Sequence, residues 1–159
     1  MKSVLAALLL AIASVNSYGS VDLVKVDKSE KKMYLLDGNK TIKEYHVALG
    51  ANPKGHKSQE ADEKTPEGRY KLDYINEDSD FYRSMHVSYP NDQDKLIAKK
   101  TGVNPGGQIM VHGQKNGWGW ISTLTQLFNW TNGCIALKNS EMDEFIALVP
   151  VGTPIQISP

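Results

Sequence analysis

The stretch TNGCIAL at residues 131–137 carries Cys134, the only cysteine of this 159-residue chain. A second stretch, IMVHG at 109–113, closes an apolar run with His112 and Gly113. A lone cysteine cannot form a disulfide within its own chain, so it either pairs with another molecule or remains a reactive thiol. A histidine that can accept the thiol proton favours the reactive thiol. We therefore predict a fold that brings the two stretches together, with Cys134 as nucleophile and His112 as its base.

The residues just before Cys134 suit acyl transfer. Gly133 permits a sharp turn and the close approach of a substrate carbonyl, and the backbone N–H groups of 132–134 can then face a developing oxyanion. Thr131 can bind the local backbone or a ligand, and its alternative role is that of a plain turn residue. We predict that Thr131, Asn132 and Gly133 contact substrate.

Two aromatic residues lie between these stretches, in QKNGWGW at 114–120. Flat rings commonly line binding grooves, so we also predict that Trp118 and Trp120 bind substrate. The alternative is ordinary packing of exposed loop aromatics.

The three remaining histidines carry weaker signals. His46 and His86 fall within alternating strands, where a structural role is the ordinary one, and His56 lies in a polar loop, where we expect it to be solvated. No pair of potential ligands has the spacing of a zinc site. We therefore expect neither a metal nor a cofactor.

The N-terminus is typical of a secretory signal peptide at 1–19, where Lys2 precedes a short apolar run and small residues follow. An uncleaved membrane anchor is the alternative, although the run is short for a span. Cleavage would leave one domain at 20–159, with 17 basic and 18 acidic side chains after the loss of Lys2. This balance gives no basis for binding nucleic acid or an anionic membrane. We expect a periplasmic or secreted protein without stable membrane insertion.

The chain pattern predicts a mostly β domain with about three short helices. An Asp-Gly pair at 37–38 predicts a hairpin, and 50–66 is predicted to be a long loop, followed later by a solvated turn at 76–80. The expected strands are 21–26, 32–36, 41–49, 69–75, 81–89, 108–111 and 153–157, and the expected helices are 93–100, 121–129 and a last one from 139 or 140 to 149.

Taken in order, five stretches resemble the bacterial L,D-transpeptidase catalytic domain. They are TPEGRY at 65–70, HVSYPN at 86–91, IMVHG at 109–113, TNGCIAL at 131–137 and VGTPIQI at 151–157. The resemblance implies a β-sandwich-like fold and an enzyme that acts on peptidoglycan stem peptides. Cys134 would attack the carbonyl of the third stem residue, usually a diamino acid, and release the terminal D-alanine. An amine of a neighbouring stem would then take the acyl group, giving a 3→3 cross-link.

The resemblance also implies roles for single residues. His112 would move the protons, and the backbone carbonyl of Gly113 would orient it. A carbapenem adduct at Cys134 is also implied.

Two positions depart from the commonest family pattern, because Asn132 replaces a second histidine and Ala136 replaces a polar residue. Cysteine-dependent cleavage or exchange on the same stem is therefore the first expectation, and cross-linking the second. The alternatives are an L,D-carboxypeptidase or amide hydrolase with water as acceptor, and a non-catalytic protein that binds the cell wall.

Overall fold

The structure, a computed structural model, describes residues 20–159, so the predicted signal peptide at 1–19 lies outside the described residues. Most of the regular structure is strand, as predicted. The strands are β1 (Leu23–Asp27), β2 (Lys32–Asp37), β3 (Lys40–His46), β4 (Gly68–Ser79), β5 (Tyr82–Val87), β6 (Met110–His112), β7 (Ile135–Ala136) and β8 (Pro154–Ser158). The helices are α1 (Asp92–Thr101), α2 (Ser122–Thr125) and α3 (Asn139–Leu148), with a 3₁₀ turn η1 (Gly119–Ile121) before α2.

The strands form one mixed sheet in the order β3-β2-β1-β8-β4-β5-β6-β7. The hairpin of β2 and β3 turns at Gly38, whose φ of 57° is a conformation that glycine adopts without strain. Two pairs of neighbouring strands are parallel: β1 with β8, the last strand of the chain, and β6 with β7. The remaining neighbours are antiparallel, so the sheet is mixed and the predicted mostly β architecture is confirmed.

The sheet curls so that its two ends meet. β4 is the longest strand and pairs with both β8 and β5, with register shifts along the β5 side. Beyond β3, Ala48 bridges to Ala136 and Gly50 bridges to Thr131, which ties the first half of the chain to the segment around β7. The curled sheet encloses the apolar core. The turn before β7 lies where the two ends of the sheet meet.

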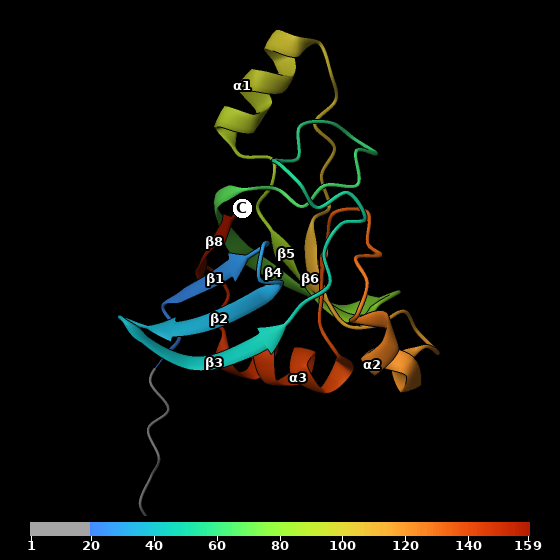
Figure 1. The fold of residues 1–159 in the computed structure, drawn as a ribbon. Helices are drawn as coiled ribbons and strands as arrows, with labels where there is room; N and C mark the ends of the chain where they lie inside the picture. Colours follow the sequence, from blue (N-terminus) through green and yellow to red (C-terminus); the bar gives the residue numbers. More distant parts are fainter. Residues whose placement is uncertain (1–19) are drawn as a thin grey trace, which may run out of the picture.

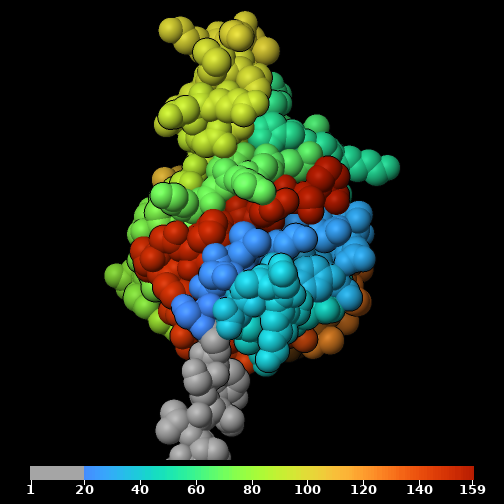
Figure 2. Space-filling model, turned by 90° about the vertical axis from the view of Figure 1, so that its left-hand side faces the viewer, coloured from blue at the N-terminus to red at the C-terminus, as the bar shows by residue number. Residues whose placement is uncertain are grey.

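Two helices lie at opposite ends of the molecule (Figure 1). α3 packs beside β5 and buries Met142 and Phe145 in the core. α1 stands out from the body (Figure 2) and is half exposed along its apolar residues. Its attachment is polar, because the Asp94 carboxylate accepts hydrogen bonds from the hydroxyl of Tyr70 and from the backbone N–H of Asn91.

Several predicted elements need correction. The helix predicted at 121–129 is wrong, because only Ser122–Thr125 is α-helical. The apolar residues that suggested it, Leu124, Leu127 and Phe128, are 59–67% exposed, so their spacing does not mark a core-facing side. The solvated turn predicted at 76–80 is mostly strand, since β4 extends to Ser79. β7 was not predicted, because two residues are too short to show an alternating pattern.

Candidate active site

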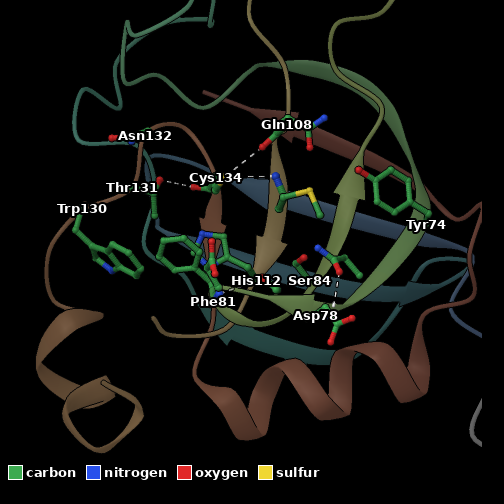
Figure 3. Close-up of a pocket in the computed structure, with 14 residues that line it drawn as sticks. Tyr74, Asp78, Phe81, Ser84, Gln108, His112, Trp130, Thr131, Asn132 and Cys134 are labelled. Atoms are coloured by element: carbon green, nitrogen blue, oxygen red, sulfur yellow. Dashed lines mark hydrogen bonds between the residues drawn. The ribbon is translucent and has the colours of Figure 1, made fainter. Parts of the chain in front are cut away.

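Strand pairing brings Cys134 and His112 to one side of the sheet. In the parallel pair of β6 and β7, Val111 lies opposite Ile135 and His112 lies opposite Ala136. Val111 and Ile135 are fully buried in the core. Since successive side chains point to opposite faces of a strand, the adjacent residues His112 and Cys134 face the other side. Both line a cavity of about 410 Å³ (Figure 3).

The imidazole of His112 has a defined orientation and a defined charge. Its Nδ1 lies 2.6 Å from the carbonyl oxygen of Gly113. A carbonyl can only accept, so Nδ1 carries the proton and Nε2 is left as the acceptor. The ring packs against Phe81 and Trp130, with centroids 4.7 and 5.7 Å away, and is only 3% exposed. Burial lowers the pKa of His112 to about 4, so the imidazole is neutral at pH 7.

Close packing around Gly113 leaves no room for a side chain at this position. A Cβ on it would lie 2.8 Å from Asn139 Oδ1 and 2.9 Å from Tyr82 Cβ. The same close packing keeps its carbonyl against His112, so the backbone takes the place that a carboxylate holds in many catalytic histidine sites.

The thiol of Cys134 lies between two backbone groups of the segment that enters β6, the strand that carries His112. Its Sγ accepts a hydrogen bond from the N–H of Met110 at 3.4 Å and donates one to the carbonyl of Gln108 at 3.6 Å. Burial raises the pKa of the Cys134 thiol, although the Met110 N–H and the positive charge of Lys57 act in the opposite direction. The thiol is therefore protonated at neutral pH.

These two pKa shifts determine the resting state of the pair. A thiol with a raised pKa and an imidazole with a pKa near 4 coexist as neutral groups rather than as a thiolate and an imidazolium. The arrangement suits general-base chemistry, in which the proton moves to Nε2 of His112 as the sulfur attacks.

The turn before Cys134 is held by Thr131. Its Oγ1 donates to the carbonyl of Cys134 at 2.7 Å and accepts from the N–H of Gly133 at 3.2 Å. Thr131 and Asn132 line the cavity, as predicted substrate-binding residues should, but the threonine hydroxyl is engaged in the turn. That either residue binds substrate remains a prediction.

The structure gives a reason for glycine at position 133 that the sequence did not show. Its φ is 118°, and a Cβ there would lie 2.5 Å from the carbonyl oxygen of Lys64. The close approach is therefore made by the loop at 50–66, in addition to any substrate carbonyl. The N–H of Gly133 is occupied by Thr131. Within residues 20–159, the N–H groups of Asn132 and Cys134 have no acceptor, so these two are the ones available to an oxyanion.

The predicted tryptophans are not at the cavity. Trp118 and Trp120 are 54% and 86% exposed and do not line it, so their role in substrate binding stays a prediction. The wall is formed instead by Phe81 and Trp130, which sequence reasoning missed. The one available signal was the position of Trp130 directly before Thr131.

The other histidines have structural partners. His86 binds Asp73 through Nδ1 at 2.7 Å, and His46 Nε2 lies 3.0 Å from a backbone carbonyl. The expectation of a solvated His56 is wrong, because Nε2 lies 3.1 Å from Asp94 and Nδ1 accepts a backbone N–H. Within the described part of the chain, no group of three potential ligands is placed to hold a metal ion, and no helix is long and apolar enough to cross a membrane.

Comparison with known protein families gave one match. The sequence model of YkuD, described as the L,D-transpeptidase catalytic domain, matches residues 22–157. This range covers nearly all of the described residues. Among curated protein sequences, no match was found.

Comparison with solved structures gave similar folds. The helical cell shape determining protein Pgp2 from Campylobacter jejuni is 26% identical, with a TM-score of 0.66 over 89% of this chain and 48% of that chain. Bd1075 of Bdellovibrio bacteriovorus is 23% identical, with a TM-score of 0.60 over 88% of this chain and 48% of that one. The L,D-transpeptidase LdtMt1 in complex with imipenem is 16% identical, with a TM-score of 0.56 over 88% and 60%. The chain thus spans about half the length of the first two, and the last two show the fold alone.

Proposed function

Because this chain belongs to the family of L,D-transpeptidase catalytic domains, we propose that it transfers acyl groups of peptidoglycan stem peptides through a thioester at Cys134. The observation that carries the proposal is the cavity that Cys134 shares with a neutral His112 whose Nδ1 is already engaged. A buried neutral imidazole with a free Nε2 is suited to take the thiol proton.

The proposed reaction has two halves. In the first, the Cys134 proton passes to Nε2 of His112 while sulfur bonds to the carbonyl carbon of the third stem residue. The bond from that carbon to the nitrogen of D-alanine then breaks, and the proton leaves with the D-alanine amine. In the second, an acceptor attacks the thioester, gives its proton to His112, and the thiol is regenerated.

Two acceptors fit the same acyl-enzyme. An amine of a neighbouring stem would give a 3→3 cross-link, and water would give a tripeptide, as in an L,D-carboxypeptidase. Asn132 is exposed at the cavity and Ala136 lies opposite His112 in the sheet, where family members commonly carry polar side chains. With fewer side chains to hold an acceptor peptide, cleavage is the primary activity of the proposal and cross-linking the second.

A carbapenem is a reasonable covalent probe of the same thiol. The LdtMt1 structure holds imipenem, and this chain shares its fold. We expect the protein to gain the mass of one carbapenem molecule, and Cys134→Ala to gain none.

The location of the protein is part of the proposal. The predicted signal peptide and a peptidoglycan substrate both place it in the periplasm or outside the cell. One structural neighbour, Pgp2, is described as determining helical cell shape. An enzyme that trims or links stem peptides can alter cell shape, so a change of shape in cells that lack this protein is an expected phenotype.

The deciding experiment is mass spectrometry of tetrapeptide muropeptides incubated with residues 20–159, beside Cys134→Ala. Tripeptide monomers would establish cleavage, and dimers lacking one D-alanine would establish cross-linking. A product spectrum that is identical for both proteins would contradict acyl transfer. It would instead favour the wall-binding alternative, which predicts that Cys134→Ala binds peptidoglycan as well as the parent protein.

A further inference from the structure

The end of the cavity away from Cys134 has a charge that the acyl-transfer residues do not account for. Among the residues that line the cavity, the charged ones are Asp78, near the end of β4, and Asp80, in the turn that follows. His112 is neutral at pH 7 because of its lowered pKa. The cavity therefore carries negative charge without a compensating cation in its lining.

These carboxylates are not engaged elsewhere in the protein. Within residues 20–159, neither the Asp78 nor the Asp80 carboxylate forms an ion pair or a hydrogen bond. The nearby Arg83 is already committed, since its guanidinium binds Glu77 at 2.6 Å and Asp143 at 2.9 Å. Asp78 and Asp80 are both exposed, so their charges are open to a cationic group that enters the cavity.

An independent feature points to the same place. Ser84 is 1% exposed and lines the cavity, yet its Oγ has no hydrogen-bond partner. Buried hydroxyls nearly always form a hydrogen bond, because an unpaired one loses its hydrogen bonds to water without a replacement, which costs free energy. An orphaned hydroxyl in a cavity wall is therefore a signal that a ligand completes it.

The sheet register arranges these groups in sequence from the predicted base. Ser84 on β5 lies opposite His112 on β6 and opposite Asn76 on β4. Asp78 lies two residues beyond Asn76 on β4, where the β4–β5 register is irregular, and it lines the same cavity as Ser84. Figure 3 shows Ser84 between the His112 and Asp78 side chains. A group held by Ser84 and Asp78 would therefore lie on the far side of the imidazole from Cys134.

We propose that Ser84, Asp78 and Asp80 form a subsite for a primary alkylammonium group of the substrate. Two carboxylates supply the opposite charge, and the hydroxyl supplies a third acceptor for the three N–H donors of an ammonium. A metal ion is disfavoured, because no group of three ligands is placed to hold one among the described residues. The inference rests on the proposed function, and it assigns the free side-chain amine of a diamino acid in the stem to this end of the cavity.

The test compares two synthetic stem tetrapeptides that differ only in the side-chain amine of the third residue, which is free in one and N-acetylated in the other. Calorimetry measures their binding to Cys134→Ala, which cannot form the thioester. The free amine should bind about fivefold more tightly or better, the effect of one partly exposed ion pair. Adding Asp78→Asn and Asp80→Asn should remove that preference, whereas adding Asp92→Asn, which removes a carboxylate on the exposed face of α1, should keep it.

Ser84→Ala separates a ligand role from a structural one. Removing a buried hydroxyl that has no partner should leave the melting temperature equal or higher. The same variant should lose several-fold of the preference for the free amine. A lower melting temperature with an unchanged preference would show that the hydroxyl is structural and would overturn its place in the subsite.

The two proposals fail in different ways. Equal binding of the two peptides, or a preference that survives the double asparagine variant, would overturn the subsite, even if the wild-type protein releases D-alanine from both. A preference abolished by the double variant, together with no release of D-alanine by the wild-type protein, would sustain the subsite and overturn the acyl transfer.

Discussion

The Nδ1 of His112 and the carbonyl oxygen of Gly113 lie 2.6 Å apart, so the backbone of the following residue orients the imidazole. A neutral carbonyl fixes the tautomer, but it offers an imidazolium less stabilisation than a carboxylate would. This agrees with a His112 pKa of about 4, which burial lowers and the Gly113 carbonyl raises only in part. Nε2 is consequently a proton acceptor over the whole range above about pH 4.

Replacing the proposed base, His112, should greatly slow turnover without unfolding the protein. We expect His112→Gln to lower kcat/KM for D-alanine release by about 100-fold or more, the usual contribution of general-base assistance. Circular dichroism and the melting temperature check that the variant folds. His86→Gln is the matched control, because His86 binds Asp73 and does not line the cavity. Loss of turnover in His86→Gln, with turnover kept in His112→Gln, would show that the base is misassigned.

The buried histidine should also make the protein sensitive to mild acid. Its folded pKa of about 4 lies below the unfolded value of about 6.5, so the unfolded state binds the extra proton between these pH values. The stability is therefore full above pH 6.5 and declines as pH falls toward 4, by about 3 kcal/mol for a shift of this size. Urea unfolding at several pH values measures this.

His112→Gln provides the comparison for the acid effect. Its unfolding free energy should fall less between pH 6.5 and 4 than that of the wild-type protein. If the two curves run parallel, the imidazole does not titrate as its burial predicts.

The sequence predicted most of what depends on short-range pattern. The three predicted strands between 21 and 49 and the Asp-Gly hairpin follow from alternation and turn chemistry, and the structure confirms them, except that the third strand ends at His46 rather than at 49. That His112 lies near Cys134 was predicted from the chemistry of a reactive thiol and from the family resemblance. In the structure, the pairing of β6 with β7 brings the two residues to one cavity.

Features that depend on distant contacts were not predictable. The need for glycine at position 133 comes from a carbonyl of the loop at 50–66, far away in sequence. Ser84 lines the cavity because β5 pairs with β6 there, and nothing in its local sequence predicts this place, whereas Trp130 had only its position before Thr131 as a signal. Trp118 and Trp120 were chosen for their ring type alone, but the chain places them in solvent.

Gly133→Ala should destabilise the fold and damage the site together. The new Cβ would meet the Lys64 carbonyl at 2.5 Å, and the φ of 118° is strained for any side chain. We expect a loss of about 1–3 kcal/mol from the overpacking, in addition to the backbone strain. Urea unfolding measures the loss. Gly152→Ala is the control for strain alone, because its φ of 95° also disfavours a side chain and a Cβ there meets nothing within 4 Å. Equal losses in the two variants would mean that the contact with Lys64 has no energetic effect.

Asp62 holds the loop that presses on this glycine. Its carboxylate accepts hydrogen bonds from the ammonium of Lys57 at 2.8 Å and from the backbone N–H groups of Ser58, Gln59 and Lys64. Burial raises the pKa of Asp62, but the hydrogen bonds from Lys57 and the backbone lower it by more, so the net shift is downward. The Asp62–Lys57 pair is buried, with side chains 8% and 3% exposed. An unpaired ammonium left in such a place is costly.

We therefore expect Asp62→Asn to lose about 3 kcal/mol of unfolding free energy at pH 7, because Lys57 keeps its charge without the opposite one. The double variant Asp62→Asn with Lys57→Met should lose less than Asp62→Asn alone, since it removes the uncompensated charge along with the pair. Urea unfolding of the two single variants and the double variant gives the coupling between the residues. If the losses of the two single variants add up to the loss of the double variant, the ion pair with Lys57 contributes nothing to holding the loop against Gly133. The three backbone hydrogen bonds of Asp62 would then hold the loop.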